Sequence, residues 1–277
     1  MARKLSDDEI SSYNNAGVAF LPQVIDPEWI DRLNALVDEQ LSNPGQWVND
    51  ANPGQTRDRM FTERYMWQHN PTIRDYVFNS GCAELAAQAM DSTTVRFYFD
   101  HLLVKEPETA TPTPWHQDVP YWPFKGHKIC SIWLALTETT VEESAMEFVR
   151  GSHAARTYYR PEVFAAREDH PNQAWTGAEG GEPVPDIEAH RDQFDIVGFD
   201  VKPGDAVIFS AWVLHGAQGN KSTDKRRAAL STRWLGDDAV WWPHPGSDPT
   251  VSQDDVNLRP GDYPADDQVF PQVWPRT

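Results

Sequence analysis

The hydrophobic periodicity of this chain changes near residue 93, and no other feature restricts its possible folds as strongly. Upstream, apolar residues recur at the spacing of an α-helix, as in "DPEWIDRLNALVDEQL" (residues 26–41), where Asp26 and Pro27 form a typical helix start. Downstream, segments such as "TVRFYFDHLLV" (residues 94–104) alternate with a period of two and are rich in β-branched and aromatic residues. Helices followed by about eight strands are expected when a jelly roll or sheet sandwich is supported on one side by helices. We therefore predict a mainly β fold with N-terminal helices.

The chain has the length of one large all-β domain, and we find neither an internal repeat nor a boundary that would divide residues 1–277. We expect helical support over about residues 1–92 and the jelly-roll core over about residues 93–236. Within the core, residues 154–192 are polar and rich in Pro and Gly, which favours an insertion that covers one rim of the sheet like a lid. Residues 237–277 show little periodicity, and we expect them to follow the surface.

Composition narrows the class of partner. The net charge of −18 argues against nucleic acid and anionic membranes, because their phosphates would be repelled. The two cysteines, Cys82 and Cys130, argue against a disulfide framework and against a cysteine metal cluster. The N-terminus has no apolar leader, and no stretch reaches the roughly 18 apolar residues of a membrane-spanning helix. We expect a soluble cytoplasmic protein with a small-molecule substrate, and composition leaves the oligomeric state open.

Three potential metal ligands stand in a β context. In "TPTPWHQDVPYWP" (residues 111–123), His116 and Asp118 are two apart, so they point the same way if the segment is a strand. His215 ends the apolar run "DAVIFSAWVLHG", which we predict to be one strand that stops at a turn at Gly216. Distant strands can be neighbours in a jelly roll. Two histidines and one carboxylate on three corners of a metal form the facial triad typical of non-haem Fe(II) oxygenases.

A basic partner follows the distal histidine. Arg226 lies 11 residues after His215, at the start of the next predicted strand. An arginine there can grip a carboxylate with two parallel hydrogen bonds, which suits a dicarboxylic co-substrate. Arg227 should then point to the opposite face. The alternative is that Arg226, Arg227 and Arg233 form an ordinary solvated charged face.

Four segments resemble the phytanoyl-CoA dioxygenase family of Fe(II)/2-oxoglutarate-dependent oxygenases: "WHQDVPYWP", "IWLALTETTVEESAMEFVRGSH", "VKPGDAVIFSAWVLHGAQGN" and "RRAALSTRW". The resemblance covers roughly residues 15–236. It implies a double-stranded β-helix (a cupin-like jelly roll), Fe(II) held by His116, Asp118 and His215, and 2-oxoglutarate held by Arg226 with Trp133 beside it. It also implies that O2 is consumed and that a small organic substrate is hydroxylated or otherwise oxidised, with release of succinate and CO2. For Trp133, a role as a core tryptophan is the alternative.

The chain departs from the family pattern at several positions. Ala217 stands where many members have a serine whose hydroxyl could contact 2-oxoglutarate. The stretch Glu143-Ser144-Ala145 and Arg150 also differ from the usual residues. We interpret His153 as a structural turn residue. Related halogenases lack the carboxylate ligand, so the presence of Asp118 favours hydroxylation or another oxidation over halogenation.

The loop after the first two ligands is the best candidate for a substrate wall. Tyr121, Trp122 and Phe124 offer apolar contact and Lys125 could bind an anion, although simple rim packing is the alternative. Further aromatic or apolar residues that could close the site are Met60, Phe61, Tyr65, Trp241 and Trp242. These side chains favour a substrate with an apolar or ring portion. We see no basic cluster that would suit a CoA thioester.

Two other functions use the same residues. A cupin-like metal-dependent hydrolase or isomerase would hold zinc or manganese at the triad and would need neither Arg226 nor oxygen. A non-catalytic β-barrel that binds a small molecule is the other alternative, and an intact triad with a matching arginine argues against it.

Overall fold

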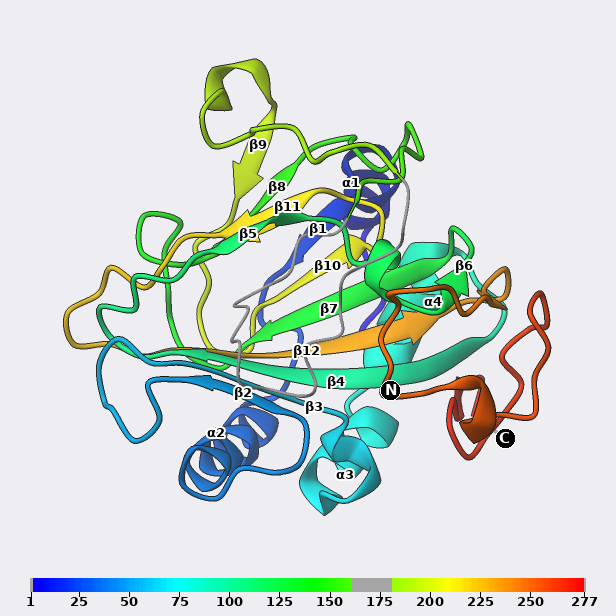
Figure 1. Ribbon diagram of the computed structural model, residues 1–277, viewed down its shortest axis with the longest axis horizontal. Coiled ribbons are helices and arrows are strands. Elements are labelled where there is room, and N and C mark those ends of the chain that lie inside the picture. Colours follow the sequence, from blue (N-terminus) through cyan, green and yellow to red (C-terminus); the bar gives the residue numbers. More distant parts are fainter. Residues whose placement is uncertain (1, 161–180, 277) are drawn as a thin grey trace.

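The computed structural model describes residues 2–160 and 181–276, which form two facing β-sheets (Figure 1). In strand order, the larger sheet contains β1 (Val18–Leu21), β10 (Ala206–Ser210), β7 (Ile129–Ala135), β12 (Arg227–Leu235), β4 (Val95–Lys105), β3 (Met60–Arg64) and β2 (Val48–Ala51), and β14 (Gln272–Trp274) also pairs with β4. The smaller sheet contains β5 (Thr113–His116), β11 (His215–Ala217), β8 (Met146–Val149) and β9 (Ile196–Gly198). A short ladder joins β13 (Val240–Trp241) to β6 (Phe124–Lys125).

Neighbouring strands in these sheets run antiparallel. The inner faces of the two sheets pack together, with the ring centroids of Phe148 and Phe209 5.1 Å apart. This arrangement is a double-stranded β-helix, and the predicted jelly roll is confirmed.

Four helices cover the outer face of the larger sheet: α1 (Asp7–Ala16), α2 (Pro27–Ser42), α3 (Pro71–Asn79) and α4 (Cys82–Met90). Ser6 and Glu9 form the capping box that starts α1, and Pro27 occupies the first turn of α2. The prediction of a helical N-terminal region was incomplete, because β1, β2 and β3 lie in the same segment and form both edges of the larger sheet. Each has at most five residues, too few to show a clear period of two, and β2 falls in a polar stretch of the sequence.

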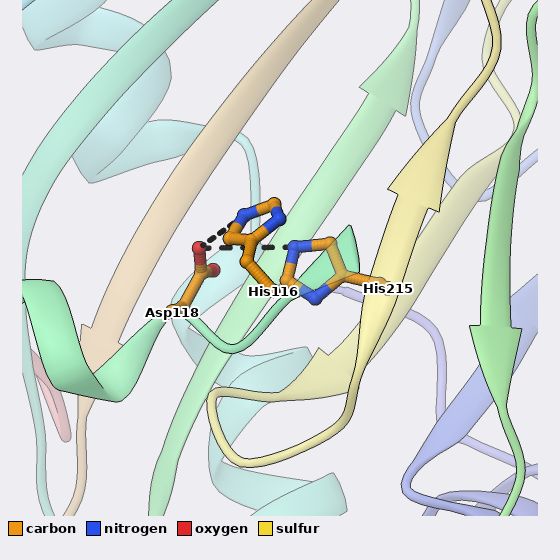
Figure 2. Close-up of side chains that lie close together, drawn as sticks. All are labelled: His116, Asp118 and His215. Atoms are coloured by element: carbon orange, nitrogen blue, oxygen red, sulfur yellow. Dashed lines mark ion pairs between the residues drawn. The ribbon is translucent and has the colours of Figure 1, made fainter. Parts of the chain in front are cut away.

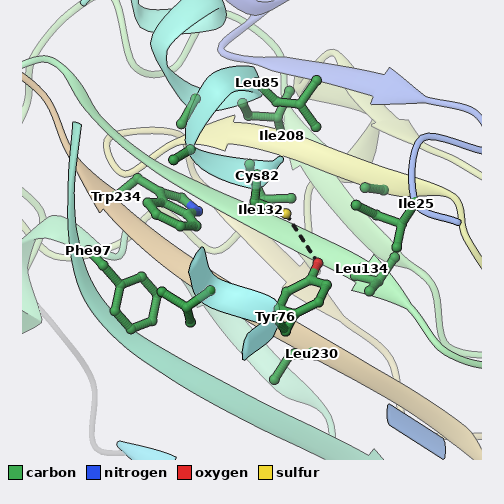
Figure 3. Close-up of a cluster of buried hydrophobic side chains, with 14 of the residues drawn as sticks. Ile25, Tyr76, Cys82, Leu85, Phe97, Ile132, Leu134, Ile208, Leu230 and Trp234 are labelled. Carbon is green, nitrogen blue, oxygen red and sulfur yellow. Dashed lines mark hydrogen bonds between the residues drawn. The ribbon is translucent and has the colours of Figure 1, made fainter. Parts of the chain in front are cut away.

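The main hydrophobic core lies between these helices and the larger sheet (Figure 3). Leu134, Ile208 and Leu230 point outward from three adjacent strands and meet Leu85 of α4 and other helical side chains. Tyr76 is buried in the same cluster, where its hydroxyl lies 3.1 Å from the Sγ atom of Cys82. Alternate side chains of a strand point to opposite faces of the sheet. The remaining side chains of each central strand therefore point into the space between the two sheets.

The run that we predicted as a single strand before His215 is in fact two strands. The chain leaves the larger sheet after Ser210, turns, and enters the smaller sheet at His215. At this crossing, the carbonyl of Ala211 accepts hydrogen bonds from the backbone N–H groups of Asp118 and Val119, at 3.0 Å each. The crossing therefore connects the two segments that carry the predicted ligands.

The C-terminal residues do more than follow the surface. The strands β13 and β14 both join ladders, and Trp241 and Phe270 are buried in an aromatic cluster with Tyr98 and Phe124. Of the insertion predicted over residues 154–192, residues 161–180 lie outside the described part of the chain. Among the residues that the structure describes, no helix has the length and apolarity needed to span a membrane.

Candidate active site

A cavity of about 190 Å³ lies between the two sheets. The smaller sheet and the loop after β5 contribute His116, Asp118 and His215 to its lining, and the larger sheet contributes polar and aromatic side chains from β3, β4, β7 and β12. The predicted ligands therefore share one enclosed space.

The three ligand side chains converge in this cavity (Figure 2). The Nε2 atoms of His116 and His215 lie 3.6 and 3.8 Å from Oδ1 of Asp118. The ligand atoms are all within 4.8 Å of one another, and the three residues are buried. Three donors at these separations can bind one metal ion.

Local structure explains this convergence. His116 is the last residue of β5 and is paired directly with His215, the first residue of β11. Asp118 lies beyond the strand end, at the N-cap of a short 3₁₀ helix, η2 (Val119–Tyr121). The predicted extended conformation from 116 to 118 is therefore wrong in detail, because the chain turns after His116. The two side chains still point toward each other.

Backbone carbonyl groups orient both imidazole rings. Nδ1 of His116 lies 2.8 Å from the carbonyl oxygen of Pro114, and Nδ1 of His215 lies 3.0 Å from that of Val213. Since a carbonyl oxygen only accepts, Nδ1 is the donor in both contacts, and Nε2 of each ring is directed toward Asp118. Burial, with a smaller effect from the neighbouring His116, lowers the pKa of His215 to about 3, so its ring is neutral. Imidazoles whose Nδ1 is held by a backbone carbonyl in this way are typical metal ligands.

Two residues of the larger sheet hold the other oxygen of Asp118. The Ser131 hydroxyl donates a hydrogen bond of 2.7 Å to Oδ2, and Nε of Arg233 lies 3.5 Å from the same atom. Burial alone would raise the pKa of the Asp118 carboxyl, but Arg233 and the two histidines lower it well below its usual range. The carboxylate is therefore ionised and directed toward the histidines. This donor set fits the facial triad of a non-haem Fe(II) centre, with the opposite corners available to other ligands.

The prediction for the two adjacent arginines is reversed by the structure. Arg226 lies outside the cavity, where it forms ion pairs with Asp38 at 2.7 Å and Glu106 at 2.8 Å. Arg227 is buried and lines the cavity. The reason is the register of β12, in which Arg227 pairs with Lys105 and shares its face with Ser231 and Arg233.

The surroundings of Arg227 contain no carboxylate among the described residues. Its guanidinium lies 5.8 Å from the ring centroid of Trp133, and its Nε lies 3.4 Å from the hydroxyl of Ser144. Burial lowers its pKa to about 10, so it remains a cation at neutral pH. Trp133 and Ala217 also line the cavity. This end of the cavity therefore presents a positive charge beside an indole ring.

The predicted substrate residues separate into two groups. Tyr121 and Trp122 line the cavity. Phe124 is instead buried in the aromatic cluster beside Trp241, because it belongs to the ladder between β6 and β13. Lys125 is exposed, and its ammonium lies 3.7 Å from the ring centroid of Trp242 on the surface. The predictions for Phe124 and Lys125 are wrong, since neither residue reaches the cavity.

Of the further residues that could close the site, Met60 lines the cavity. The others face elsewhere: Phe61 lies in the main core, Tyr65 and Trp241 lie in the aromatic cluster, and Trp242 is 38% exposed. His153 lies away from the cavity, and its Nε2 is 3.2 Å from the carbonyl of Asn14, as expected for a structural residue.

Sequence reasoning missed four polar residues near the site: Arg64, His101, Ser131 and Arg233. The sequence does contain a signal for Arg233. Arg233 has the same strand parity as Arg227, and two of the three residues between them at the opposite parity, Ala228 and Leu230, are apolar. For Arg64 no comparable signal existed, because its strand was not predicted.

Comparisons with known proteins agree with this geometry. The family model described as "Phytanoyl-CoA dioxygenase (PhyH)" matches residues 13–228. A probable phytanoyl-CoA dioxygenase of Caenorhabditis elegans is 24% identical over 65% of this chain, and the match spans 56% of the nematode protein. SnoK, a non-haem α-ketoglutarate-dependent carbocyclase from nogalamycin biosynthesis, has a TM-score of 0.73 and 25% identity, with 97% of this chain and 96% of SnoK covered. The epimerase SnoN, solved with Fe3+, α-ketoglutarate and nogalamycin RO, has a TM-score of 0.71 and 22% identity, with 96% of this chain and 98% of SnoN covered. With its ligand triad, its fold and the extent of the family match, this chain belongs to the phytanoyl-CoA dioxygenase family.

Proposed function

We propose that this protein is an Fe(II)- and 2-oxoglutarate-dependent dioxygenase that hydroxylates or otherwise oxidises a small organic substrate, with release of succinate and CO2. The observation that carries the proposal is one buried cavity that contains both a His-Asp-His triad and a guanidinium without a carboxylate partner among the described residues. A metal-dependent hydrolase or isomerase would use the triad but has no need for the second feature.

The buried charge of Arg227 supports 2-oxoglutarate in particular. An isolated cation in a protein interior is costly unless an anion compensates it. A dicarboxylate that contacts the metal at one end would place its other carboxylate within reach of a cation further along the cavity. Arg227 can grip that carboxylate through two parallel hydrogen bonds, and Ser144 and Trp133 lie beside it. We assign to Arg227 the role that the sequence suggested for Arg226.

In this proposal the bound iron and co-substrate supply the oxidising chemistry. The protein positions them and the substrate and excludes water. His116, Asp118 and His215 hold the metal. Ser131 and Arg233 hold the carboxylate of Asp118 in place. Tyr121 and Trp122 form an aromatic wall that excludes water and contacts an apolar part of the substrate.

The nature of the partner follows from the same cavity and from the composition. SnoN was solved with nogalamycin RO, which supports a small organic molecule as the substrate here. The net charge of −18 supports an enzyme without a nucleic acid or membrane partner, and the two buried free thiols, Cys82 and Cys130, suit a cytoplasmic location.

An anaerobic spectrum tests the proposed function. Addition of Fe(II) and 2-oxoglutarate to the protein should give a weak visible charge-transfer band, and admission of oxygen should release succinate. Asp118→Ala should abolish both signals, whereas the control Asp192→Ala, at an exposed position, should retain them. If the native protein gives neither band nor succinate, the proposed function is wrong.

A further inference from the structure

A buried serine contacts the cavity arginine from outside the cavity. Oγ of Ser144 lies 3.4 Å from Nε of Arg227, and Ser144 is fully buried. Arg227 lines the cavity, whereas Ser144 does not. We propose that Ser144 is a positioning residue for the co-substrate: its hydroxyl fixes the guanidinium of Arg227, so that the enzyme selects a 2-oxo acid with a second carboxylate. This inference rests on the proposed function.

The guanidinium of Arg227 needs a fixed partner because another cation lies beside it. Arg227 and Lys105 are directly opposite each other on β12 and β4, and both are buried. Like charges at opposite positions of a sheet repel each other. Burial, with a smaller effect from Arg227, lowers the pKa of Lys105 well below its usual value. A long side chain with many rotamers would move away from such a neighbour unless a hydrogen bond held it.

One backbone carbonyl determines where the hydroxyl of Ser144 points. The carbonyl oxygen of Gln218 accepts hydrogen bonds from Oγ of Ser144 at 3.1 Å and from Nζ of Lys105 at 2.7 Å. Since a carbonyl only accepts, the hydroxyl proton of Ser144 points toward Gln218, and a lone pair of Oγ is left for Nε of Arg227. The two cations are therefore held in place through one carbonyl and one hydroxyl.

The turn before β8 fixes the position of Ser144 itself. The backbone N–H groups of Ser144 and Ala145 both donate to the carbonyl of Thr140, at 3.0 and 2.9 Å. The hydroxyl is attached to a backbone that these bonds hold, and its side chain is sealed from solvent. The short serine side chain therefore sets the position that the longer arginine side chain adopts.

This position determines which edge of the guanidinium is presented to a ligand. Nε of Arg227 is directed to Ser144, so the N–H groups of its two Nη atoms can bind a carboxylate together. The ring centroid of Trp133, 5.8 Å from the guanidinium, limits movement on another side. A group that is held before binding loses less conformational entropy when its ligand arrives. The hydroxyl should thus strengthen binding of the remote carboxylate without affecting the end of the co-substrate that contacts the metal.

A pair of 2-oxo acids with equal numbers of carbon atoms tests this inference. 2-Oxovalerate has a methyl group where 2-oxoglutarate has its remote carboxylate. Each acid is titrated into the Fe(II) protein without oxygen, and the visible band gives its dissociation constant. Ser144→Ala should bind 2-oxoglutarate about tenfold more weakly, because Arg227 loses the hydrogen bond that positions its charge. Its affinities for 2-oxovalerate and for Fe(II) should be unchanged.

Further variants separate positioning from a general effect on folding. Ser144→Cys has a side chain of similar shape with a weak donor and acceptor, so its affinity for 2-oxoglutarate should lie between those of Ser144→Ala and the native protein. Ser92→Ala should change neither dissociation constant. It removes another buried hydroxyl that both donates and accepts, to the carbonyl of Thr94 and from the N–H of Asp237.

The inference is overturned if a folded Ser144 variant binds 2-oxoglutarate as tightly as the native protein, or if it binds both 2-oxo acids more weakly by the same factor. Circular dichroism identifies the folded variants, and Ser144→Cys alone carries the test if Ser144→Ala does not fold. A failure of the proposed function would appear separately, as the absence of a band when 2-oxoglutarate is added to the native Fe(II) protein.

Discussion

Ser131 of the larger sheet donates a hydrogen bond of 2.7 Å to Oδ2 of Asp118, a predicted metal ligand from the loop after β5. Arg233 approaches the same oxygen, and Oδ1 faces the Nε2 atoms of both histidines. The two carboxylate oxygens therefore have different surroundings: Oδ2 contacts the sheet and Oδ1 faces the site. Residues that do not bind the metal themselves determine how Asp118 presents its charge.

Removal of the Ser131 hydroxyl should weaken metal binding. Partners that orient metal ligands typically contribute about 10- to 100-fold to metal affinity, so Ser131→Ala should raise the dissociation constant for Mn(II) within that range. Electron paramagnetic resonance of free Mn(II) measures the change. Ser12→Ala, which removes a hydroxyl that donates to the carbonyl of Val18, is the control. Equal affinities in a folded Ser131→Ala protein would show that this bond does not position the ligand.

Glu63 should make the free energy of unfolding depend on pH. It is buried on the outer side of β3, with Oε1 accepting a bond from the N–H of Gly45. Burial, with a smaller contribution from Asp100, raises its pKa from 4.5 to about 7. Between these values the folded state binds more protons than the unfolded state, so stability falls as pH rises and then levels off above pH 7.

Glu63→Gln removes this titration and should flatten that dependence. The expected difference between variant and native protein grows by a few kcal/mol from pH 5 to pH 8, at about 1.4 kcal/mol per pH unit over which the proton is retained. Urea unfolding at several pH values measures it. The exposed Glu28→Gln is the matched control. Parallel curves for native protein and Glu63→Gln would contradict the expected protonation.

Leu230 should matter for stability and not for ligand binding. It points from β12 into the main core, on the face opposite to Arg227. Leu230→Ala should cost about 2–5 kcal/mol of unfolding free energy, because it removes buried surface and leaves a cavity. Urea denaturation gives this value, and 2-oxoglutarate affinity at low temperature should stay near that of the native protein. A large loss of affinity in the folded variant would mean that the two faces of β12 are not independent.

The fold class and the set of metal ligands could be predicted, because they depend on hydrophobic periodicity and on residue type. The jelly roll followed from the period of two after residue 93, and the ligand set followed from His116, Asp118 and His215 in a β context. The prediction that these side chains converge is confirmed, whereas the predicted extended conformation from His116 to Asp118 is wrong. Asp118 turns out of the strand, and its position depends on backbone bonds to Ala211 from a distant segment.

The wrong predictions concern residues whose position is set by strand pairing, which local sequence does not fully specify. Arg226 and Arg227 differ by one residue, and a shift of one residue exchanges the two faces of a strand. Pairing of Arg227 with Lys105 settles the choice, and the apolar residues Ala228 and Leu230 at the opposite parity are the local indication of it in the sequence. Phe124 and Lys125 were misplaced for a similar reason, because the ladder with β13 draws them away from the cavity.

The affinity of 2-oxoglutarate for two neighbouring variants tests the central claim, that one cavity holds iron at the triad and the co-substrate at Arg227. Anaerobic titration of the Fe(II) protein, followed by its visible band, gives the dissociation constant. Arg227→Gln should weaken 2-oxoglutarate by about a hundredfold with little change in Fe(II) affinity, because it removes a buried bidentate partner of a carboxylate. Arg226→Gln should stay within about twofold of the native protein, since Arg226 and its partners Asp38 and Glu106 lie outside the cavity. The opposite ranking of the two variants would contradict the account.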